Sequence, residues 1–232
     1  GSPGFMDGVN CAVIAFGNDN SGKTFTIEGS GPAAKDGVIP SVIAGIYEAI
    51  REKLAGVQRG GKKSKGWRHK ISVQYIELVD EKINDLLNPL KIELDVDELG
   101  INEGLGIRNL TRKWVDSEDE LFHHFRVGQA SRTSFRTEFG PMSKRAVAIF
   151  AIELHQVVSR VQQGYKIPVE EHLFSRFCVI DTPGADKVAE DPTTLRIREG
   201  PTLNNAIIAF SQLVKTLAQS SDIRNSDLVD FK

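Results

Sequence analysis

The sequence predicts one α/β domain in which strands alternate with helices. Two observations support this class: short apolar runs of strand length recur along the chain, and segments with helical spacing of apolar residues lie between them. No internal repeat or low-complexity tract interrupts this order. The 232 residues suit one large domain or two small ones. We expect residues 6–232 to form a single domain, and residues 1–5 to be a cloning remnant, which we leave out of the fold prediction.

The first predicted strand is Cys11–Phe16, a continuous apolar run that ends at a glycine. Such a run is typical of a strand buried on both faces of a sheet. Val38–Leu54 carries apolar residues at close to helical spacing and has Pro40 near its start, so it predicts an amphipathic helix packed on the sheet. A basic loop over residues 60–66 separates this helix from the next strand, in which Ile71 is an early residue.

Further elements are predicted in the second half of the chain. Ser117–Glu120 has the form of a capping box, in which the serine hydroxyl and the glutamate carboxylate each satisfy a backbone amide at the start of a helix. Val147–Ile152 and Phe177–Ile180 are two more strand candidates, and Leu203–Leu217 predicts a long closing helix. Strands and helices therefore alternate along the whole chain.

Composition excludes several classes of protein. Hydrophobic residues make up 40% of the chain, which is enough apolar surface to exclude a disordered polyampholyte. With 29 Lys+Arg against 31 Asp+Glu, the net charge of -2 excludes a strongly basic nucleic-acid binder. No apolar run is long enough to span a bilayer and no signal peptide is recognisable, so we expect a soluble intracellular protein without membrane insertion.

Cysteines and histidines give no sign of a metal centre. Cys11 and Cys178 each lie in an apolar run, which favours buried, reduced thiols over a disulfide or a metal site. The five histidines show no metal-ligand spacing, so we expect them to be structural or on the surface.

A phosphate-binding loop is predicted directly after the first strand. Gly17–Thr24 reads GNDNSGKT and fits G-x-x-x-x-G-K-[ST], with a plausible helix after it. Its glycines let backbone N–H groups turn toward nucleotide phosphates, and the helix start adds positive potential. The alternative is an ordinary glycine-rich turn, which would not require the Lys and Thr. The predicted nucleotide-binding residues are Gly17, Asn18, Asn20, Ser21, Gly22, Lys23 at the β/γ-phosphates, and Thr24 as a Mg²⁺ ligand.

A second acidic element follows the strand that ends at Ile180. Asp181-Thr182-Pro183-Gly184 offers a carboxylate for Mg²⁺ and a backbone amide, that of Gly184, for the terminal phosphate. The same four residues are also a good turn sequence. They indicate a nucleotide site only because a phosphate loop is present in the same chain. This pair suggests a GTPase first, but Asp181 lies 158 positions after Lys23 and no guanine-reading Asn/Thr-Lys-x-Asp motif follows.

Longer stretches resemble the kinesin motor domain. Val73–Leu87, VQYIELVDEKINDLL, is similar without a gap to the kinesin pattern VSYLEIYNEKIRDLL. The resemblance implies a P-loop NTPase fold with a central, mostly parallel or mixed sheet and helices on both faces. It also implies that the first strands of the motor, and its last strand and helix, are absent from this sequence. Other matching stretches are Asp7–Gly29, Gly37–Pro40, Arg132–Val147, Asp181–Asp186, Leu203–Phe210 and Arg224–Leu228.

The resemblance assigns roles to residues near the phosphates. Ser143 stands at the first switch I serine, which helps to position the attacking water, and Gly184 stands at the switch II glycine. Arg145 and Asp186 stand at the pair that links the two switches, with Asp186 one methylene shorter than the usual glutamate. Phe25 stands where the family stacks an aromatic ring on adenine; a core phenylalanine is an equal alternative on packing grounds.

The function implied by the resemblance is a cytoplasmic, cytoskeleton-associated motor that uses ATP and Mg²⁺ and moves on microtubules, with dimerisation through regions outside this chain. Lys144 replaces a family serine that contacts Mg²⁺, and lysine cannot ligate a cation. One alternative is therefore a kinesin-fold nucleotide-binding scaffold with impaired hydrolysis and weak or altered microtubule binding. An unrelated P-loop GTPase is a minor alternative. The basic loop near Lys62 could attract acidic tubulin tails or could be a solvated surface loop.

Overall fold

The computed structural model describes residues 4–18, 20–31, 35–58, 66–79, 82–88, 90, 93–94, 96–98, 105–132, 135–137, 140–143, 146–161 and 168–184. The helix predicted over residues 203–217 lies outside these ranges. The elements, in chain order, are η1 (Phe5–Asp7), β1 (Cys11–Ala15), α1 (Lys23–Glu28), α2 (Val38–Gln58), β2 (Trp67–Val79), β3 (Lys82–Asp85), β4 (Glu93–Leu94), β5 (Val96–Glu98), β6 (Leu105–Ile107), β7 (Lys113–Val115), α3 (Glu118–Ser131), β8 (Phe135–Thr137), β9 (Gly140–Ser143), β10 (Val147–Val161) and β11 (Pro168–Asp181).

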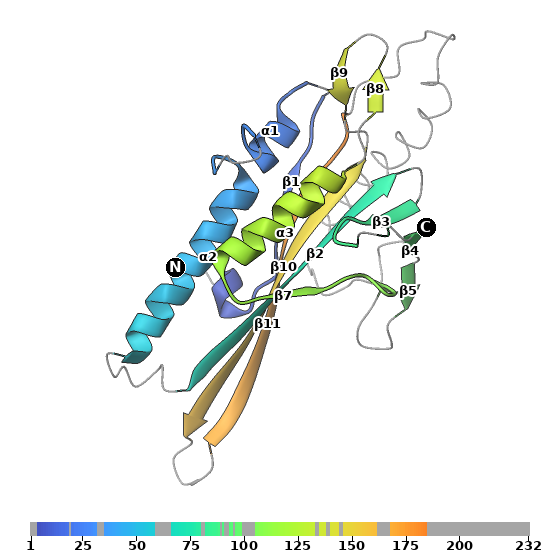
Figure 1. The fold of residues 1–232 in the computed structure, drawn as a ribbon. Helices are drawn as coiled ribbons and strands as arrows, with labels where there is room; N and C mark the ends of the chain where they lie inside the picture. The colour runs from blue at the N-terminus through green and yellow to red at the C-terminus, as the bar shows by residue number, and fades with distance from the viewer. Residues whose placement is uncertain are drawn as a thin grey trace, which may run out of the picture.

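One mixed sheet organises the described part of the chain. Its strand order is β1-β11-β10-β2-β3-β4, with β7 paired to β2 (Figure 1). β1 and β11 are parallel, and the other pairs are antiparallel. Two small antiparallel pairs, β5–β6 and β8–β9, lie outside this sheet. The predicted α/β class with a mixed sheet is therefore confirmed.

Three long strands form the centre of the sheet. β10 pairs with β11 from Ala148↔Asp181 to Val161↔Pro168, and with β2 from Val147↔Leu78 to Val158↔Trp67. The sequence predicted only the apolar ends of β10 and β11. Their remaining halves contain polar residues that interrupt the apolar runs, such as Glu153 and His155 in β10 and Glu170 and Glu171 in β11.

All three described α-helices cover the same face of this sheet (Figure 1). Tyr75 of β2 lies under α3, where its ring packs near Phe125 at a centroid distance of 6.3 Å and against Phe150 of β10 at 5.1 Å. Ile43 and Ile46 of α2 belong to the same buried cluster. The predicted helix over residues 38–54 is confirmed and extends to Gln58. Helices on the other face remain a prediction.

Helix α3 begins close to where the capping box predicted it. Ser117 is the N-cap residue, and its Oγ accepts a hydrogen bond from the Glu120 amide at 3.2 Å. The Glu120 carboxylate accepts instead from the amide of Asp116, one residue before the N-cap, at 2.9 Å. Both halves of the box thus bind backbone amides, with the second shifted by one residue.

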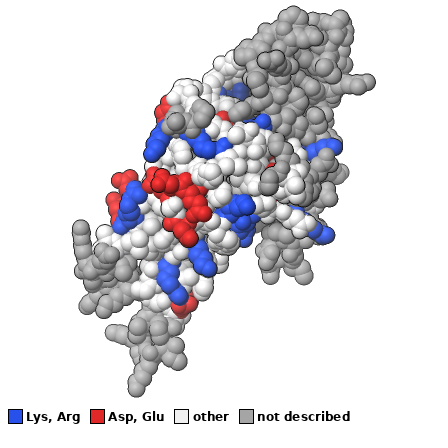
Figure 2. All heavy atoms as spheres, viewed as in Figure 1, with Lys and Arg blue, Asp and Glu red and all other residues white. Residues whose placement is uncertain are grey.

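Acidic side chains gather on the face that Figure 2 shows, over the region of α2 and α3. The first turn of α3 supplies Glu118, Asp119 and Glu120. Negative charge at this end of a helix is stabilised by the helix dipole. Arg51 of α2 pairs with Glu118 at 3.1 Å. Burial, assisted by the nearby carboxylates, raises the pKa of Tyr47 above its ordinary value.

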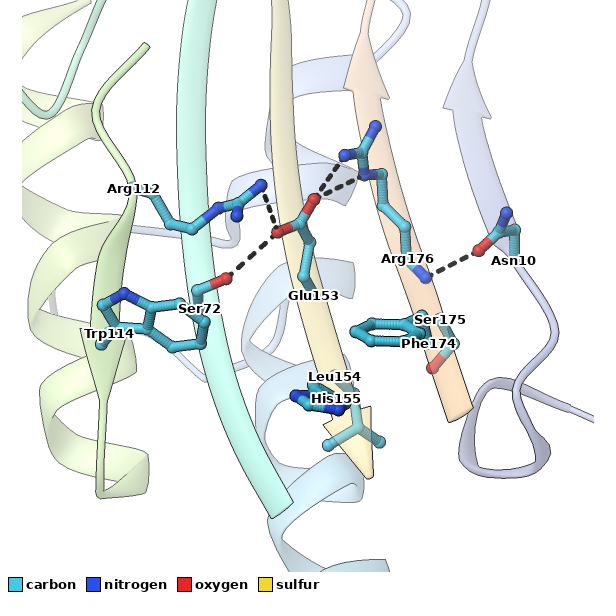
Figure 3. A pocket seen from close by; sticks show the side chains of 10 residues that line it. All are labelled: Asn10, Ser72, Arg112, Trp114, Glu153, Leu154, His155, Phe174, Ser175 and Arg176. Carbon is cyan, nitrogen blue, oxygen red and sulfur yellow. Dashed lines mark hydrogen bonds and ion pairs between the residues drawn. The ribbon is translucent and has the colours of Figure 1, made fainter. Parts of the chain in front are cut away.

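The opposite face of the sheet holds a cavity of about 380 Å³ (Figure 3). Glu153 of β10 lies at its centre and pairs with two arginines, Arg112 at 3.0 Å and Arg176 of the neighbouring strand. Ser72 of β2 donates to the same carboxylate at 3.2 Å. Ser72, Glu153 and Arg176 therefore bind one another across three neighbouring strands, and Arg112 joins them from the residue before β7.

The structure adds to one expectation about the start of the chain and overturns another. Phe5, set aside with the first five residues, is only 7% exposed and packs edge-on against Phe177 at a centroid distance of 5.9 Å. A buried aromatic ring stabilises the core, so this residue belongs to the fold. Ala12 and Ile14 of β1 are exposed, so the strand is not buried on both faces. The helices of the described residues cover only the other side of this strand.

Both cysteines are free and partly buried, as expected for reduced thiols. Burial raises the pKa of the Cys178 thiol. None of the helices in the described ranges has the length and apolar character needed to cross a membrane.

Candidate functional site

The two predicted phosphate-binding elements meet at one end of the parallel strand pair. β1 and β11 are in register with Ala15 opposite Asp181, so the loop after β1 and the residues after β11 start side by side. Thr182 joins the ends of the two strands, because its backbone amide and its Oγ1 both donate to the carbonyl of Ala15, at 3.3 Å and 2.7 Å. The carboxyl ends of parallel strands are where ligands bind in open α/β sheets.

The loop over residues 17–24 has backbone conformations that favour glycine. Gly17 and Gly22 have φ values of 152° and 85°, and Asn20 has a φ of 57°. A side chain at Gly17 would lie 3.3 Å from Ser21 Oγ, which is tight. Lys23 Nζ donates to the carbonyl of Asn18, so the lysine side chain folds back over its own loop. The loop thus has the turns that would let backbone groups surround a phosphate.

Thr24 and Asp181, which the sequence predicts as ligands of one Mg²⁺ ion, are in direct contact, and the metal role itself stays a prediction. Thr24 Oγ1 donates to Asp181 Oδ2 at 2.7 Å. Asp181 is 3% exposed, and its Oδ1 is buried without a hydrogen-bond partner in the described part of the chain. A buried carboxylate oxygen normally has a partner, so this atom is suited to a ligand.

Phe25 follows at the start of α1 with 61% of its surface exposed. A core phenylalanine would be buried, so the core alternative is wrong. The exposed ring is consistent with stacking on a base, and that role stays a prediction.

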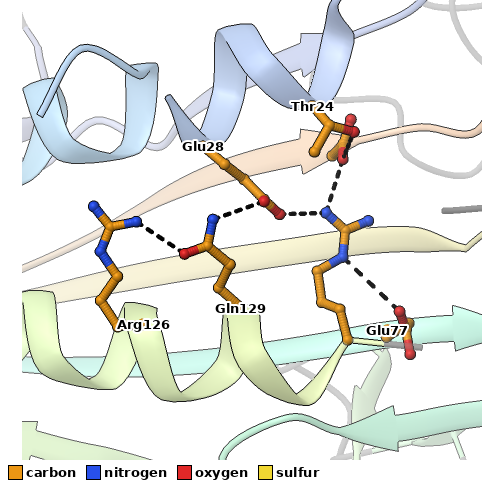
Figure 4. Close-up of polar contacts among 7 residues, drawn as sticks. Thr24, Glu28, Glu77, Arg126 and Gln129 are labelled. Atoms are coloured by element: carbon orange, nitrogen blue, oxygen red, sulfur yellow. Dashed lines mark hydrogen bonds and ion pairs between the residues drawn. The ribbon is translucent and has the colours of Figure 1, made fainter. Parts of the chain in front are cut away.

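A buried arginine connects the site to α3. Arg132 Nη1 donates to Asp181 Oδ2 at 2.8 Å and to Glu28 Oε1 at 2.5 Å, and its Nε lies 3.9 Å from Glu77 Oε1 (Figure 4). The Arg132 side chain is 1% exposed, and those of its three partners are at most 5% exposed. Charged groups this deeply buried are normally paired, as here.

The same cluster extends along α3 through neutral and cationic groups. Gln129 Nε2 donates to Glu28 Oε2 at 2.8 Å, and Arg126 Nη1 donates to Gln129 Oε1 at 2.8 Å (Figure 4). Arg126 also donates to the carbonyl of Gly31 at 3.2 Å. The residues after the phosphate-loop helix are therefore held by the second half of α3.

Electrostatics keep the central guanidinium charged. Burial alone would lower the pKa of Arg132, but the adjacent carboxylates Glu28 and Asp181 outweigh it and raise the pKa above its ordinary value. The guanidinium therefore acts as a fixed positive charge beside the predicted metal ligand Asp181.

Sequence reasoning assigned no role to Glu28, Glu77 or Arg132. A usable signal was present for one of them: Glu77 interrupts the apolar run from Tyr75 to Val79. A charge inside a buried strand requires a partner, which would have predicted an ion pair there. Glu28 and Arg132 stand at helix ends, where charged residues are common, so their burial was not readable from the sequence.

The remaining predicted residues are placed only in part. Ser143 ends β9, opposite Phe135 of β8, and this hairpin lies at the same end of the sheet as α1 (Figure 1). Gly184 is buried, three residues after Asp181. Arg145 and Asp186 lie outside the described residues, so their pairing is still a prediction.

The residues present fit a magnesium nucleotide. A carboxylate oxygen that has no partner among the described residues and a threonine hydroxyl 2.7 Å from the same carboxylate are the oxygen donors that Mg²⁺ prefers. The lysine of the adjoining loop is the usual point charge for phosphate. A mixed α/β sheet with a phosphate loop between its first strand and helix defines a P-loop NTPase fold.

Comparison with known proteins identifies the family. A model of the kinesin motor domain matches residues 3–232, so the chain belongs to the kinesin motor domain family. Kinesin-like protein KIF22 of Xenopus tropicalis is 26% identical over 94% of this chain and 32% of its own length. Kinesin-like protein KIF21B of Homo sapiens is 28% identical over 94% of this chain and 15% of its own length. The chain thus spans about a third or less of these relatives.

Solved kinesin structures share the fold. The structure of a fast kinesin is 25% identical, with a TM-score of 0.73 over 94% of this chain and 58% of that one. A KIF14 dimer bound to a microtubule with AMP-PNP has a TM-score of 0.71 at 22% identity, over 92% of this chain and 56% of that one. The chain therefore spans between half and two thirds of these structures.

Proposed function

We propose that this chain is a motor domain that binds ATP with Mg²⁺ and couples ATP hydrolysis to microtubule binding and movement. The observation that carries the proposal is the 2.7 Å hydrogen bond between Thr24 and Asp181. It joins the phosphate loop to the strand end whose movement would report the state of the nucleotide. Membership of the kinesin family supports the microtubule as the track.

Each element of the site would have a defined task. The loop over residues 17–24 would hold the nucleotide phosphates, with Lys23 as the cation and the Phe25 ring against the base. Thr24 and Asp181 would hold Mg²⁺, which supplies positive charge where negative charge develops during phosphoryl transfer. Arg132 would fix the Asp181 carboxylate through its 2.8 Å ion pair.

The switch residues would complete hydrolysis. Ser143 would orient the attacking water, and the Gly184 amide would bind the terminal phosphate. A pair between Arg145 and Asp186 would close the site around the nucleotide. Loss of phosphate would release this closure and shift the segment over residues 203–218, which changes affinity for the track.

A second candidate is a kinesin-fold nucleotide-binding scaffold with impaired hydrolysis. Two observations favour it: Lys144 replaces a serine that contacts Mg²⁺ in the family, and Arg132 already neutralises the Asp181 carboxylate. Hydrolysis requires positioned water and stabilised charge together, so such changes reduce the rate more than they reduce binding.

Phosphate release measured with and without microtubules separates the two candidates. A motor is expected to release phosphate much faster with microtubules than without them, and to prefer ATP over GTP. A scaffold would bind nucleotide, and microtubules would leave its rate of phosphate release unchanged. Preference for GTP would contradict both candidates and support a GTPase.

Two threonines on α1 provide a matched pair of variants. Thr24→Ala removes the predicted metal ligand, and we expect the hydrolysis rate to fall roughly 10²-fold or more. Thr26→Ala changes the same side chain at an exposed position and should leave the rate unchanged. Equal rates in the two variants would contradict the metal role of Thr24. Unchanged nucleotide affinity in Lys23→Ala would contradict the phosphate loop itself.

For the cell, we propose that the protein associates with the cytoskeleton in the cytoplasm. Dimerisation through regions outside this chain belongs to the same proposal.

A further inference from the structure

Glu28 and Asp181 bind the same nitrogen of Arg132. Arg132 Nη1 donates to Glu28 Oε1 at 2.5 Å and to Asp181 Oδ2 at 2.8 Å. This nitrogen carries two hydrogens, so each carboxylate accepts one of them. The two carboxylates therefore share one positive charge, and a change at either one alters how strongly the other is neutralised.

The position of Glu28 is fixed by its neighbours. Its second oxygen, Oε2, accepts a hydrogen bond from Gln129 Nε2 at 2.8 Å (Figure 4). Its backbone is confined as well, because a Cβ atom built at Gly37 would lie 2.6 Å from the carbonyl carbon of Glu28. The Glu28 side chain is 5% exposed, so water screens its charge only weakly. Glu28 is thus a buried carboxylate held at a set distance from the guanidinium.

The shared guanidinium affects the carboxylate that is the predicted Mg²⁺ ligand. Asp181 Oδ1 has no partner among the described residues, whereas Oδ2 accepts from both Thr24 and Arg132. The charge of the ligands is one factor that sets the affinity of an oxygen site for a divalent cation. A guanidinium bound to Asp181 alone would neutralise it more completely and weaken its attraction for the ion. Glu28 limits this effect because it binds the same Nη1.

We propose that Glu28 is a positioning residue that raises the affinity of Asp181 for Mg²⁺ by holding part of the Arg132 charge. Glu28 acts through Arg132 and not on the ion itself. The inference rests on the proposed function, since it requires the magnesium nucleotide site at Thr24 and Asp181. Partners of metal ligands commonly have such an effect, and their loss typically costs roughly 10- to 100-fold in metal affinity.

Binding of a fluorescent ADP analogue to the whole chain, measured with excess Mg²⁺ and again with EDTA, tests this role. The quantity of interest is the factor by which Mg²⁺ tightens nucleotide binding. We expect this factor to fall roughly tenfold in Glu28→Gln, which keeps the size of the side chain and removes its charge.

Gln129→Met tests the same inference with the opposite sign. It removes a donor from Glu28, which leaves more of the Glu28 charge for Arg132 and less of the Arg132 charge for Asp181. The factor should therefore be as large as in the wild type or larger. Local damage to the structure would instead reduce it in both variants, and that result would overturn the proposal.

Glu153→Gln is the matched control. Glu153 also binds arginines, Arg112 at 3.0 Å and Arg176, but it lies on the opposite face of the sheet (Figure 3). Its loss should leave the Mg²⁺ factor at the wild-type value. The inference is overturned if Glu28→Gln and Glu153→Gln have equal factors. A wild type whose nucleotide affinity does not depend on Mg²⁺ is a different result, which would contradict the proposed function itself.

Discussion

Arg132 occupies an unusual position for a charged residue, because its side chain is 1% exposed and faces three carboxylates. Desolvating an arginine is costly, and only close ion pairs offset that cost. Two of its partners belong to the first helix and to the end of β11, which are far apart in sequence. A single side chain therefore holds the two halves of the candidate site together.

Replacing this arginine should be strongly destabilising. In Arg132→Leu, three carboxylates lose a buried cation, and breaking a buried ion pair typically costs about 3–5 kcal/mol. Arg51→Leu removes an arginine that is 62% exposed from a similar pair with Glu118, which should cost less than about 1 kcal/mol. Urea unfolding of both variants measures the difference. Similar losses would contradict a special role for the buried pair.

Among the single residues of the candidate site, the sequence predicted best those that belong to a motif with a known chemical role. Two motifs predicted that Thr24 and Asp181 serve the same Mg²⁺ ion, and the structure places these residues, 157 positions apart in the chain, within hydrogen-bond distance. The sequence did not predict that Arg132 binds Asp181, because the burial of Arg132 depends on where the end of α3 meets the sheet. Phe25 could not be assigned from packing rules alone, since exposure at a helix start depends on tertiary neighbours.

At the level of elements, the packing of α3 on β2 depends on Gly128. A Cβ atom built at this position would lie 2.2 Å from Cδ1 of the Tyr75 ring. That ring is buried against Phe125 and Phe150, so it has no room to move. The missing side chain therefore sets how closely the helix approaches the strand.

Gly128→Ala should destabilise the protein despite the better helix propensity of alanine. Overpacking a core typically costs about 1–3 kcal/mol, and a clash this close should exceed the gain in propensity of about 1 kcal/mol. Gly45→Ala in α2 is the matched control, because nothing lies within 4 Å of a Cβ atom there. We expect thermal unfolding to show a lower melting temperature for the first variant and an equal or higher one for the second. A stabilised Gly128→Ala would contradict the close packing.

Local signals predicted the starts of elements better than their extents. The Ser117 capping box gave the start of α3, because it depends on a few neighbouring residues. The distal half of β10 was missed because Glu153, His155 and other polar residues interrupt its apolar run. That half is stabilised by pairing with β2 and β11, which no local pattern contains.

At the level of the whole molecule, acid should destabilise the fold partly through a half-buried histidine. His69 stacks on Trp67 at a centroid distance of 4.8 Å, and burial lowers its pKa below the ordinary 6.5. The unfolded chain therefore binds a proton at a higher pH than the native chain. By linkage, stability falls as the pH drops below about 6.5 and continues to fall until the lowered native pKa is passed.

The variant His69→Phe keeps a ring over Trp67 and removes the titrating group. We expect its free energy of unfolding to fall less than that of the wild type between about pH 7.5 and about pH 5.5. Urea unfolding at both pH values gives this double difference, in which any change of packing cancels. An equal fall in the two proteins would show that His69 contributes nothing to the acid sensitivity.

The arrangement of β11 between two very different partners has a consequence for how the chain folds. On one side it pairs with β10, and only six residues separate Val161 from Pro168, so bringing these two strands together has a small entropic cost. On the other side, the bond between Thr182 and Ala15 joins residues 167 positions apart. Contacts of large sequence separation generally form late, so we expect amides of the β10–β11 pair to gain protection in pulse-labelled hydrogen exchange before those of β1. The edge that carries Thr24 and Asp181 would then be completed last, and nucleotide would bind only to chains that have almost finished folding.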